Sequence, residues 1–179
     1  MRAFIVLACL PALSACGFHL RGSESVRLPA ELHTLRVVTS DRTAYPPLLV
    51  EMRNALTSQA GVELAPTDAA APTLTLFAES SSSEPVVGST AYATAYILSY
   101  KVSFSLKDAA GREAVAKNTV RVQREYEADP TQNVIAKEKE ADFLRAEMQR
   151  DAIQQILRRL ANVTMPPATP PAAPAASPP

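Results

Sequence analysis

The sequence lacks most of the residues on which enzymes and metal sites depend. It has no tryptophan, two histidines, two cysteines and five glycines in 179 residues. His19 and His33 complete no zinc-binding spacing and no catalytic triad, and the glycines never gather into a phosphate-binding loop. The mixed charges of residues 137–142 are more typical of a solvated helix face than of catalytic carboxylates. We therefore expect a non-enzymatic protein that needs neither a metal nor a cofactor.

An excess of charge of one sign is also lacking. The chain has 18 basic and 18 acidic residues, so its formal net charge is +0. No overall field draws such a chain toward nucleic acid, and any anion would have to bind at a local patch. An apolar run of about 20 residues, the length that spans a bilayer, is missing as well. We expect no nucleic-acid partner and no membrane-spanning helix.

The N-terminus carries the layout of an exported, lipid-anchored protein. A basic tip precedes an uncharged apolar run, residues 3–15, which ends in LSAC at Cys16. Such a layout is typical of a secretory signal, and LSAC resembles the bacterial lipobox, in which the chain is cut before a cysteine that then carries acyl chains. Several acyl chains give lasting attachment to a membrane. We predict a lipoprotein signal peptide over residues 1–15 and a lipidated linker over residues 16–27.

Two details refine this prediction. Gly17 follows the cysteine, whereas an aspartate there retains enterobacterial lipoproteins in the inner membrane, so the outer membrane is favoured. An ordinary signal with a chance cysteine, or a buried N-terminal helix, would not require Cys16 to stand at the end of the apolar run.

The C-terminus is equally distinctive. Residues 164–179 are rich in proline and alanine and carry no charge. A segment of this composition cannot bury enough apolar surface to offset the entropy of ordering it. We predict a disordered tail over residues 164–179 and one folded domain over residues 28–163.

Hydrophobic periodicity predicts four strands and two helices in this domain. In chain order they are a strand at 32–39, a helix from 47 that ends before Gly61, strands at 73–80, 95–107 and 113–126, and a helix that starts near 129–132 and reaches 160. The strand at 73–80 is expected to place Leu74, Leu76 and Ala78 on one face. The predicted fold is an α/β (α+β) two-layer sandwich, with two helices on one face of a mixed four-stranded sheet in the order β-α-β-β-β-α.

The strongest signal is a long antiparallel hairpin made by residues 95–107 and 113–126. Strict alternation gives it an apolar inner face and a polar outer face. Four cations fall on the outer face, which has no acidic residue before Glu125: Lys101, Lys107, Lys117 and Arg121. This face is either a solvated surface or a patch for an anionic head group, such as a lipid phosphate.

Several segments together resemble the lipopolysaccharide-assembly lipoprotein family LptE. The first is CGFHLRG directly after the lipobox, and the second is PPLLVEMRNALTSQAGVEL. YILSYKVSFSL and EYEADPTQNVIAKEKEADFLRAEMQRDAIQQILRRL follow in the family's order and spacing. The resemblance covers residues 16–161, and the family's two-layer sandwich agrees with the fold predicted above.

The resemblance implies a role without catalysis. Members of the family sit as a plug inside the LptD β-barrel, help the barrel assemble and bind lipopolysaccharide during its delivery to the outer leaflet. It also implies a lipid-anchored outer-membrane protein whose folded domain enters the periplasm and the barrel lumen. Lys137 matches a basic position of the family and is the first choice for a phosphate contact, ahead of the four hairpin cations.

The chain departs from the family at one point, and two other functions remain open. Relatives can carry an arginine in the loop between the second and third strands, whereas residues 79–92 of this chain contain no basic residue and include Glu84. The chain could instead be an auxiliary lipoprotein of a different envelope lipid-transport complex, or an anchored enzyme. Co-purification from detergent extracts separates the barrel plug from the auxiliary lipoprotein, and a screen for hydrolytic or transferase activity tests the enzyme.

Overall fold

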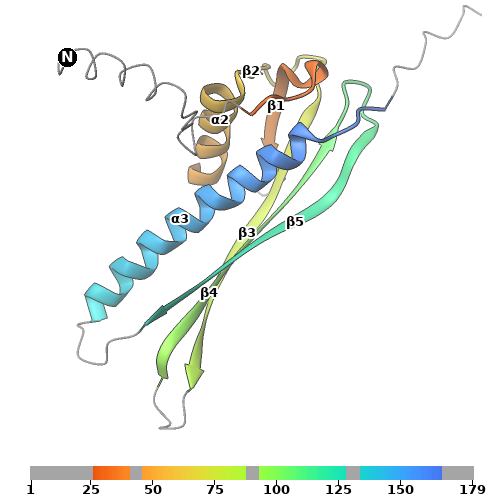
Figure 1. Cartoon of the computed structure of the whole chain (residues 1–179). Helices are drawn as coiled ribbons and strands as arrows, with labels where there is room; N and C mark the ends of the chain where they lie inside the picture. The colour runs from red at the N-terminus through yellow and green to blue at the C-terminus, as the bar shows by residue number, and fades with distance from the viewer. Residues whose placement is uncertain (1–25, 41–45, 88–92, 128–133, 167–179) are drawn as a thin grey trace, which may run out of the picture.

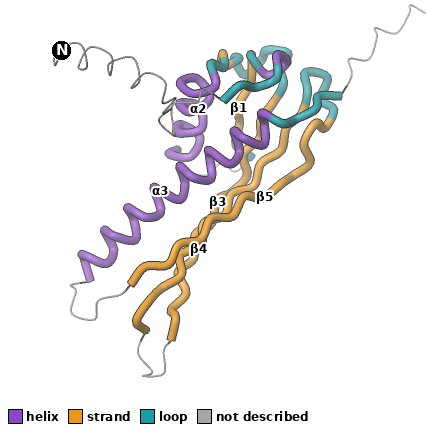
Figure 2. Tube along the Cα trace, in the orientation of Figure 1, coloured by secondary structure: helices purple, strands orange, loops and turns teal. Residues whose placement is uncertain are grey.

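The computed structural model describes residues 26–40, 46–87, 93–127 and 134–166, which form two layers. One layer is a long twisted sheet, and the other consists of two helices that lie on the same side of it (Figures 1 and 2). The predicted signal peptide, Cys16, the helix start at residues 129–132 and the tail beyond residue 166 lie outside the described residues. The α+β sandwich with two helices and a mixed sheet is confirmed.

The sheet has five strands in the order β2-β1-β3-β4-β5, one more than predicted. Their bounds are β1 Thr34–Thr39, β2 Glu63–Leu64, β3 Thr73–Val87, β4 Ala93–Lys107 and β5 Glu113–Glu127. β1 pairs in parallel with β2 and β3, while β3, β4 and β5 are antiparallel neighbours. The predicted four-strand count and order were wrong because β2 has only two residues, too few to show a periodicity. The order along the chain is β-α-β-β-β-β-α.

Strand β3 also differs from the prediction, in its length and in its facing. It continues to Val87, so most of the loop expected at residues 79–92 is strand. A β-bulge lies between Leu76, which pairs with Phe104, and Glu79, which pairs with Val102. The extra residue shifts the alternation, so Glu79 faces the helices and Ala78 is exposed. The prediction that Ala78 shares a buried face with Leu76 was therefore wrong.

Two helices cover one face of the sheet. Helix α2 spans Pro46–Ala60 and is followed by Gly61, whose φ of 64° is the left-handed conformation of a helix C-cap. Helix α3 spans Val134–Ala161 and buries a row of apolar residues spaced by four: Met148, Ala152, Ile156 and Leu160. A single 3-10 turn, η2 (Ala30–Leu32), precedes β1. None of the helices in the described parts of the chain is long and apolar enough to cross a membrane.

The core lies between these layers and confirms the alternation predicted for the hairpin. In β4 the buried helix-facing residues are Leu98, Tyr100, Val102, Phe104 and Leu106, joined by Val120 and Val122 of β5. Burying each large apolar side chain stabilises the fold by about 1.5–3 kcal/mol. At the rim of the core, Arg124 of β5 forms ion pairs with Asp151 at 2.5 Å and with Glu147 at 3.9 Å, both in α3. The side of β3, β4 and β5 opposite the helices is left uncovered within the described structure.

Candidate functional site

The uncovered side of β3, β4 and β5, here called the open face, is polar along its centre. It carries Ser80 of β3, Ser99, Lys101 and Ser103 of β4, and Thr119, Arg121 and Gln123 of β5. Side chains alternate across a strand, so the burial of Tyr100 and Val102 under the helices turns Lys101 to this face. The same alternation turns Arg121 to it, between the buried Val120 and Val122.

Three successive cross-strand pairs form the centre of the open face. In the first, Gln123 Nε2 donates a hydrogen bond to Ser99 Oγ at 3.0 Å. In the third, the hydroxyls of Ser103 and Thr119 lie 2.8 Å apart and share a hydrogen bond. The pair between them is Lys101 opposite Arg121, two cations.

This central pair has no compensating charge within the described structure. Ser80, the residue opposite Lys101 on β3, is neutral. None of the ion pairs between described residues includes Lys101 or Arg121. Like charges directly opposite each other destabilise a sheet. A bound anion would remove this repulsion and supply acceptors for both side chains.

Two of the other predicted cations have neighbours of their own. Lys117 Nζ lies 4.3 Å from the ring centroid of Phe77, a cation–π contact. Lys107, the last residue of β4, is opposite Glu113, so the expectation of no acidic residue before Glu125 was wrong. Lys137 belongs to α3, but its side chain lies outside the described residues, as does Cys16. Of the four hairpin cations, Lys101 and Arg121 are the two that the structure places directly opposite each other.

A second polar cluster lies on the helix side, next to the β3 bulge. The hydroxyl of Tyr100 donates a hydrogen bond to Glu79 Oε2, and Gln149 Nε2 of α3 donates to the same oxygen at 3.2 Å. Burial, followed by the hydrogen bond to the Glu79 carboxylate and its negative charge, raises the pKa of Tyr100 far above its ordinary value. Tyr100 thus remains a neutral donor, and the cluster joins β3, β4 and α3.

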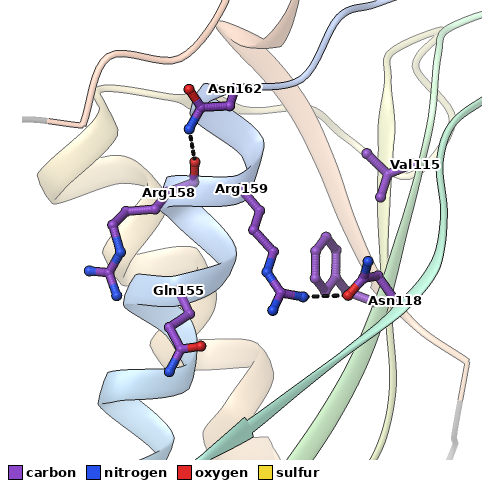
Figure 3. Close-up of a pocket in the computed structure, with 7 residues that line it drawn as sticks. Val115, Asn118, Gln155, Arg158, Arg159 and Asn162 are labelled. Carbon is purple, nitrogen blue, oxygen red and sulfur yellow. Dashed lines mark hydrogen bonds between the residues drawn. The ribbon is translucent and has the colours of Figure 1, made fainter.

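A third cluster lies between the end of α3 and β5, where it lines a pocket of about 450 Å³ (Figure 3). Arg159 donates to Asn118 Oδ1 and to the carbonyl of Thr119, the latter at 3.3 Å. Asn118 faces the helix side because it pairs with Phe104, and a second bulge separates that pair from Leu106 and Val115. Sequence reasoning missed this cluster, since a bulge in β5 leaves no periodic signal.

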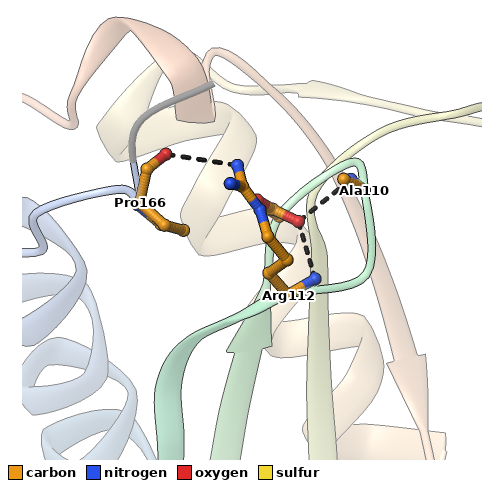
Figure 4. A network of polar contacts seen from close by, with 4 residues as sticks. Ala110, Arg112 and Pro166 are labelled. Carbon is orange, nitrogen blue, oxygen red and sulfur yellow. Dashed lines mark hydrogen bonds and ion pairs between the residues drawn. The ribbon is translucent and has the colours of Figure 1, made fainter. Parts of the chain in front are cut away.

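The hairpin turn forms a fourth polar network (Figure 4). Asp108 Oδ1 accepts from the backbone N–H of Ala110 and Arg112, and Oδ2 accepts from Arg112 Nε at 2.7 Å. Desolvation raises the pKa of Asp108, but the hydrogen bonds and the charge of Arg112 outweigh it and hold that pKa below its usual value. Arg112 also donates to the carbonyl of Pro166 at 3.4 Å, which fixes the exit of the chain beyond α3.

These clusters do not resemble a metal site. In the parts of the chain that the structure describes, no group of three or more His, Cys, Asp or Glu side chains could hold a metal ion. The described clusters offer hydrogen-bond donors and cations at the surface, while the carboxylates of Glu79 and Asp108 are held by donors of their own.

Solved structures share this fold and define the class of protein. Rare lipoprotein B from Shewanella oneidensis is 25% identical, with a TM-score of 0.62 over 72% of this chain and 93% of that one. Lipoprotein B from Nitrosomonas europaea is 22% identical, with a TM-score of 0.63 over 81% and 90% of the two chains. A minor lipoprotein from Acinetobacter baumannii is 21% identical, with a TM-score of 0.59 over 75% and 98%. The chain therefore has the two-layer α+β fold of these bacterial lipoproteins.

The sequence identifies the family within this class. The model of the LptE family, described as lipopolysaccharide-assembly, matches residues 32–160. The chain belongs to the LptE family, so the family predicted from the sequence is confirmed. Membership of a lipopolysaccharide-assembly family also agrees with the prediction of a role without catalysis. Curated protein sequences give no significant match.

Proposed function

We propose that this chain is an outer-membrane lipoprotein, anchored through Cys16, that plugs and helps assemble the LptD β-barrel and binds lipopolysaccharide on its open face. The observation that carries the binding proposal is the pair Lys101 and Arg121, two directly opposed cations between two hydrogen-bonded pairs. Family membership supports the lipopolysaccharide-assembly role. The phosphates of lipid A and the inner core have the charge and the acceptor oxygens that this pair lacks.

Three further cations complete the proposed contact. Lys117 and Lys107 extend the basic surface along β5 and β4, and Lys137 follows β5 at the start of α3. Each exposed charge pair contributes about 1 kcal/mol or less, so one substitution alone changes the affinity little. One polyanion engaged by several cations is held more firmly than any pair suggests, and its binding weakens as salt screens the charges.

The proposed anchor is tested by changing Cys16 to serine. The cysteine at the end of LSAC is the acceptor for acylation, so we expect Cys16→Ser to abolish palmitate labelling and to release the protein from the membrane. The matched change Cys9→Ser, inside the apolar run, leaves labelling intact. Normal labelling of the Cys16→Ser protein would refute the anchor.

The proposed partner is tested by co-purification of the lipidated chain from detergent extracts. A barrel protein whose mobility on a gel changes on heating supports the plug. Inner-membrane transporter subunits in its place would instead support the alternative, an auxiliary lipoprotein of a different lipid-transport complex.

A further inference from the structure

The pocket at the end of α3 is basic and holds no acidic residue. It is lined by Phe104, Val115, Asn118, Gln155, Arg158, Arg159 and Asn162, among which only the two arginines are charged. It lies on the helix side of the sheet and is therefore separate from the open face. Figure 3 shows Gln155, Arg158 and Arg159 projecting from the last turns of α3, with Arg159 directed toward Asn118 and Arg158 toward the other side of the helix.

The two arginines are not needed to cap the helix. Cations commonly stand at a helix C-terminus because the last carbonyls lack partners. Here Asn162 Nδ2 donates to the carbonyl of Arg158 at 2.8 Å, and the Asn162 backbone N–H donates to that of Arg159 at 3.1 Å. The Val163 N–H donates to the carbonyl of Leu160 at 3.2 Å. Three carbonyls of the last turn thus have partners without either guanidinium.

The guanidinium groups have neutral partners or none within the described structure. Arg159 binds the amide oxygen of Asn118 and a backbone carbonyl, neither of which cancels its charge. No described residue forms a hydrogen bond or an ion pair with the Arg158 side chain, which is exposed. A guanidinium has five N–H donors in a planar fork that fits two oxygens of one phosphate.

We propose that this pocket is a second oxyanion site, which binds a phosphate ester through Arg159, with Arg158 as a second cation at its rim. The amide groups of Gln155 and Asn118 add neutral donors, and the methyl groups of Val115 form an apolar wall for the esterified part of the ligand. Its volume of about 450 Å³ is within the range of small-molecule sites. The site does not depend on the proposed role of the open face, because different residues on opposite sides of the sheet form the two.

The test follows arginine Nε–Hε resonances of the full chain in neutral detergent micelles. One arm adds inorganic phosphate, and the other adds phosphatidylglycerol to the same micelles. A shift in the first arm indicates a site that accepts free phosphate, and a shift confined to the second indicates a lipid head group. Either result supports the site, provided that binding is weakened when Arg158 and Arg159 are both changed to glutamine. If the Arg158 and Arg159 resonances move in neither arm, the proposal is wrong.

The variants separate the pocket from a general effect of charge. Arg158→Gln removes a side chain without a described partner, so folding is preserved, and combined with Arg159→Gln it should weaken binding at least about tenfold. Arg150→Gln is the control, because Arg150 is exposed on the same helix but lines a different groove. Equal weakening by Arg150→Gln, or unchanged binding by the double variant of Arg158 and Arg159, would overturn the proposal.

Discussion

At the scale of single residues, the Tyr100 hydroxyl shows how a buried polar group fixes the packing of α3. It is the donor that satisfies Glu79 from within the sheet, while Gln149 satisfies the same oxygen from the helix. Losing one partner of a buried polar group costs about 1–3 kcal/mol, because the remaining partner loses its compensation. This hydroxyl therefore connects the bulge of β3 to the register of α3.

We expect Tyr100→Phe to lower the free energy of unfolding by about 1–2 kcal/mol. Tyr96→Phe is the matched control, because Tyr96 is only partly buried and keeps its ring stacking on Tyr126, with centroids 5.5 Å apart. Urea unfolding measures both. Since the pKa of Tyr100 is raised in the fold, its contribution is present below the ordinary tyrosine pKa of about 10 and is lost as the pH rises further. An equal effect of the two substitutions would contradict this account.

Asp108 gives a prediction in acid. Its pKa is depressed in the folded state, so the stability that it contributes is present above the unfolded value of 3.8 and is lost as the pH falls below it. We expect Asp108→Asn to lower the melting temperature at neutral pH, because the charge that binds Arg112 is lost. In strong acid the variant and the parent should melt alike. A difference in melting temperature that is the same at neutral and at acid pH would exclude the titration of Asp108 as its cause.

At the scale of elements, some features follow from local pattern and others do not. The alternation of β4 predicted its buried row, from Leu98 to Leu106, because period two is a property of one strand by itself. The bulge at Ala78 and the two-residue β2 depend on pairing with distant strands, which no window of the sequence contains. Arg159 of α3 and Asn118 of β5 are 41 positions apart in the sequence, and their contact depends on another bulge.

The sequence predicted where helix α2 ends, because Gly61 marks its C-terminus. Gly61 has a φ of 64°, and a Cβ built on it would meet no atom within 4 Å. Only backbone strain then opposes a side chain, and we expect Gly61→Ala to lower the free energy of unfolding by about 1–2 kcal/mol. Gly61→Asn should cost less, because asparagine tolerates this conformation. Denaturant unfolding measures both, and an alanine variant as stable as the parent would argue against the left-handed cap.

At the scale of the whole molecule, the two layers assign different tasks to the two faces of one sheet. The helix side is occupied by the core and by polar contacts between the sheet and α3, so it is unavailable to a large ligand except at the rim. The open face is uncovered and carries the unmatched pair Lys101 and Arg121. The composition of the chain hides this pair, because a net charge of +0 says nothing of how charges are arranged on a surface.

The two faces of the sheet can be tested in a shortened chain without the anchor residue Cys16. Every described element lies between residues 26 and 166, and the core extends from Leu28 to Leu160. A chain of residues 17–179 therefore keeps all of them. Circular dichroism and thermal melting establish that each variant of it folds like the parent.

The most direct test of the central claim is lipopolysaccharide binding by this chain, with Lys101, Arg121 and Lys137 all changed to glutamate. The matched control reverses Arg27, Lys139 and Arg150, three exposed cations that have no described ion pair. The triple variant of Lys101, Arg121 and Lys137 should bind at least about tenfold more weakly than the parent, which is about 1.4 kcal/mol, and with less dependence on salt. The control should stay close to the parent. If the triple variant binds as well as the parent, the pair Lys101 and Arg121 is only a solvated surface and the open face does not bind lipopolysaccharide.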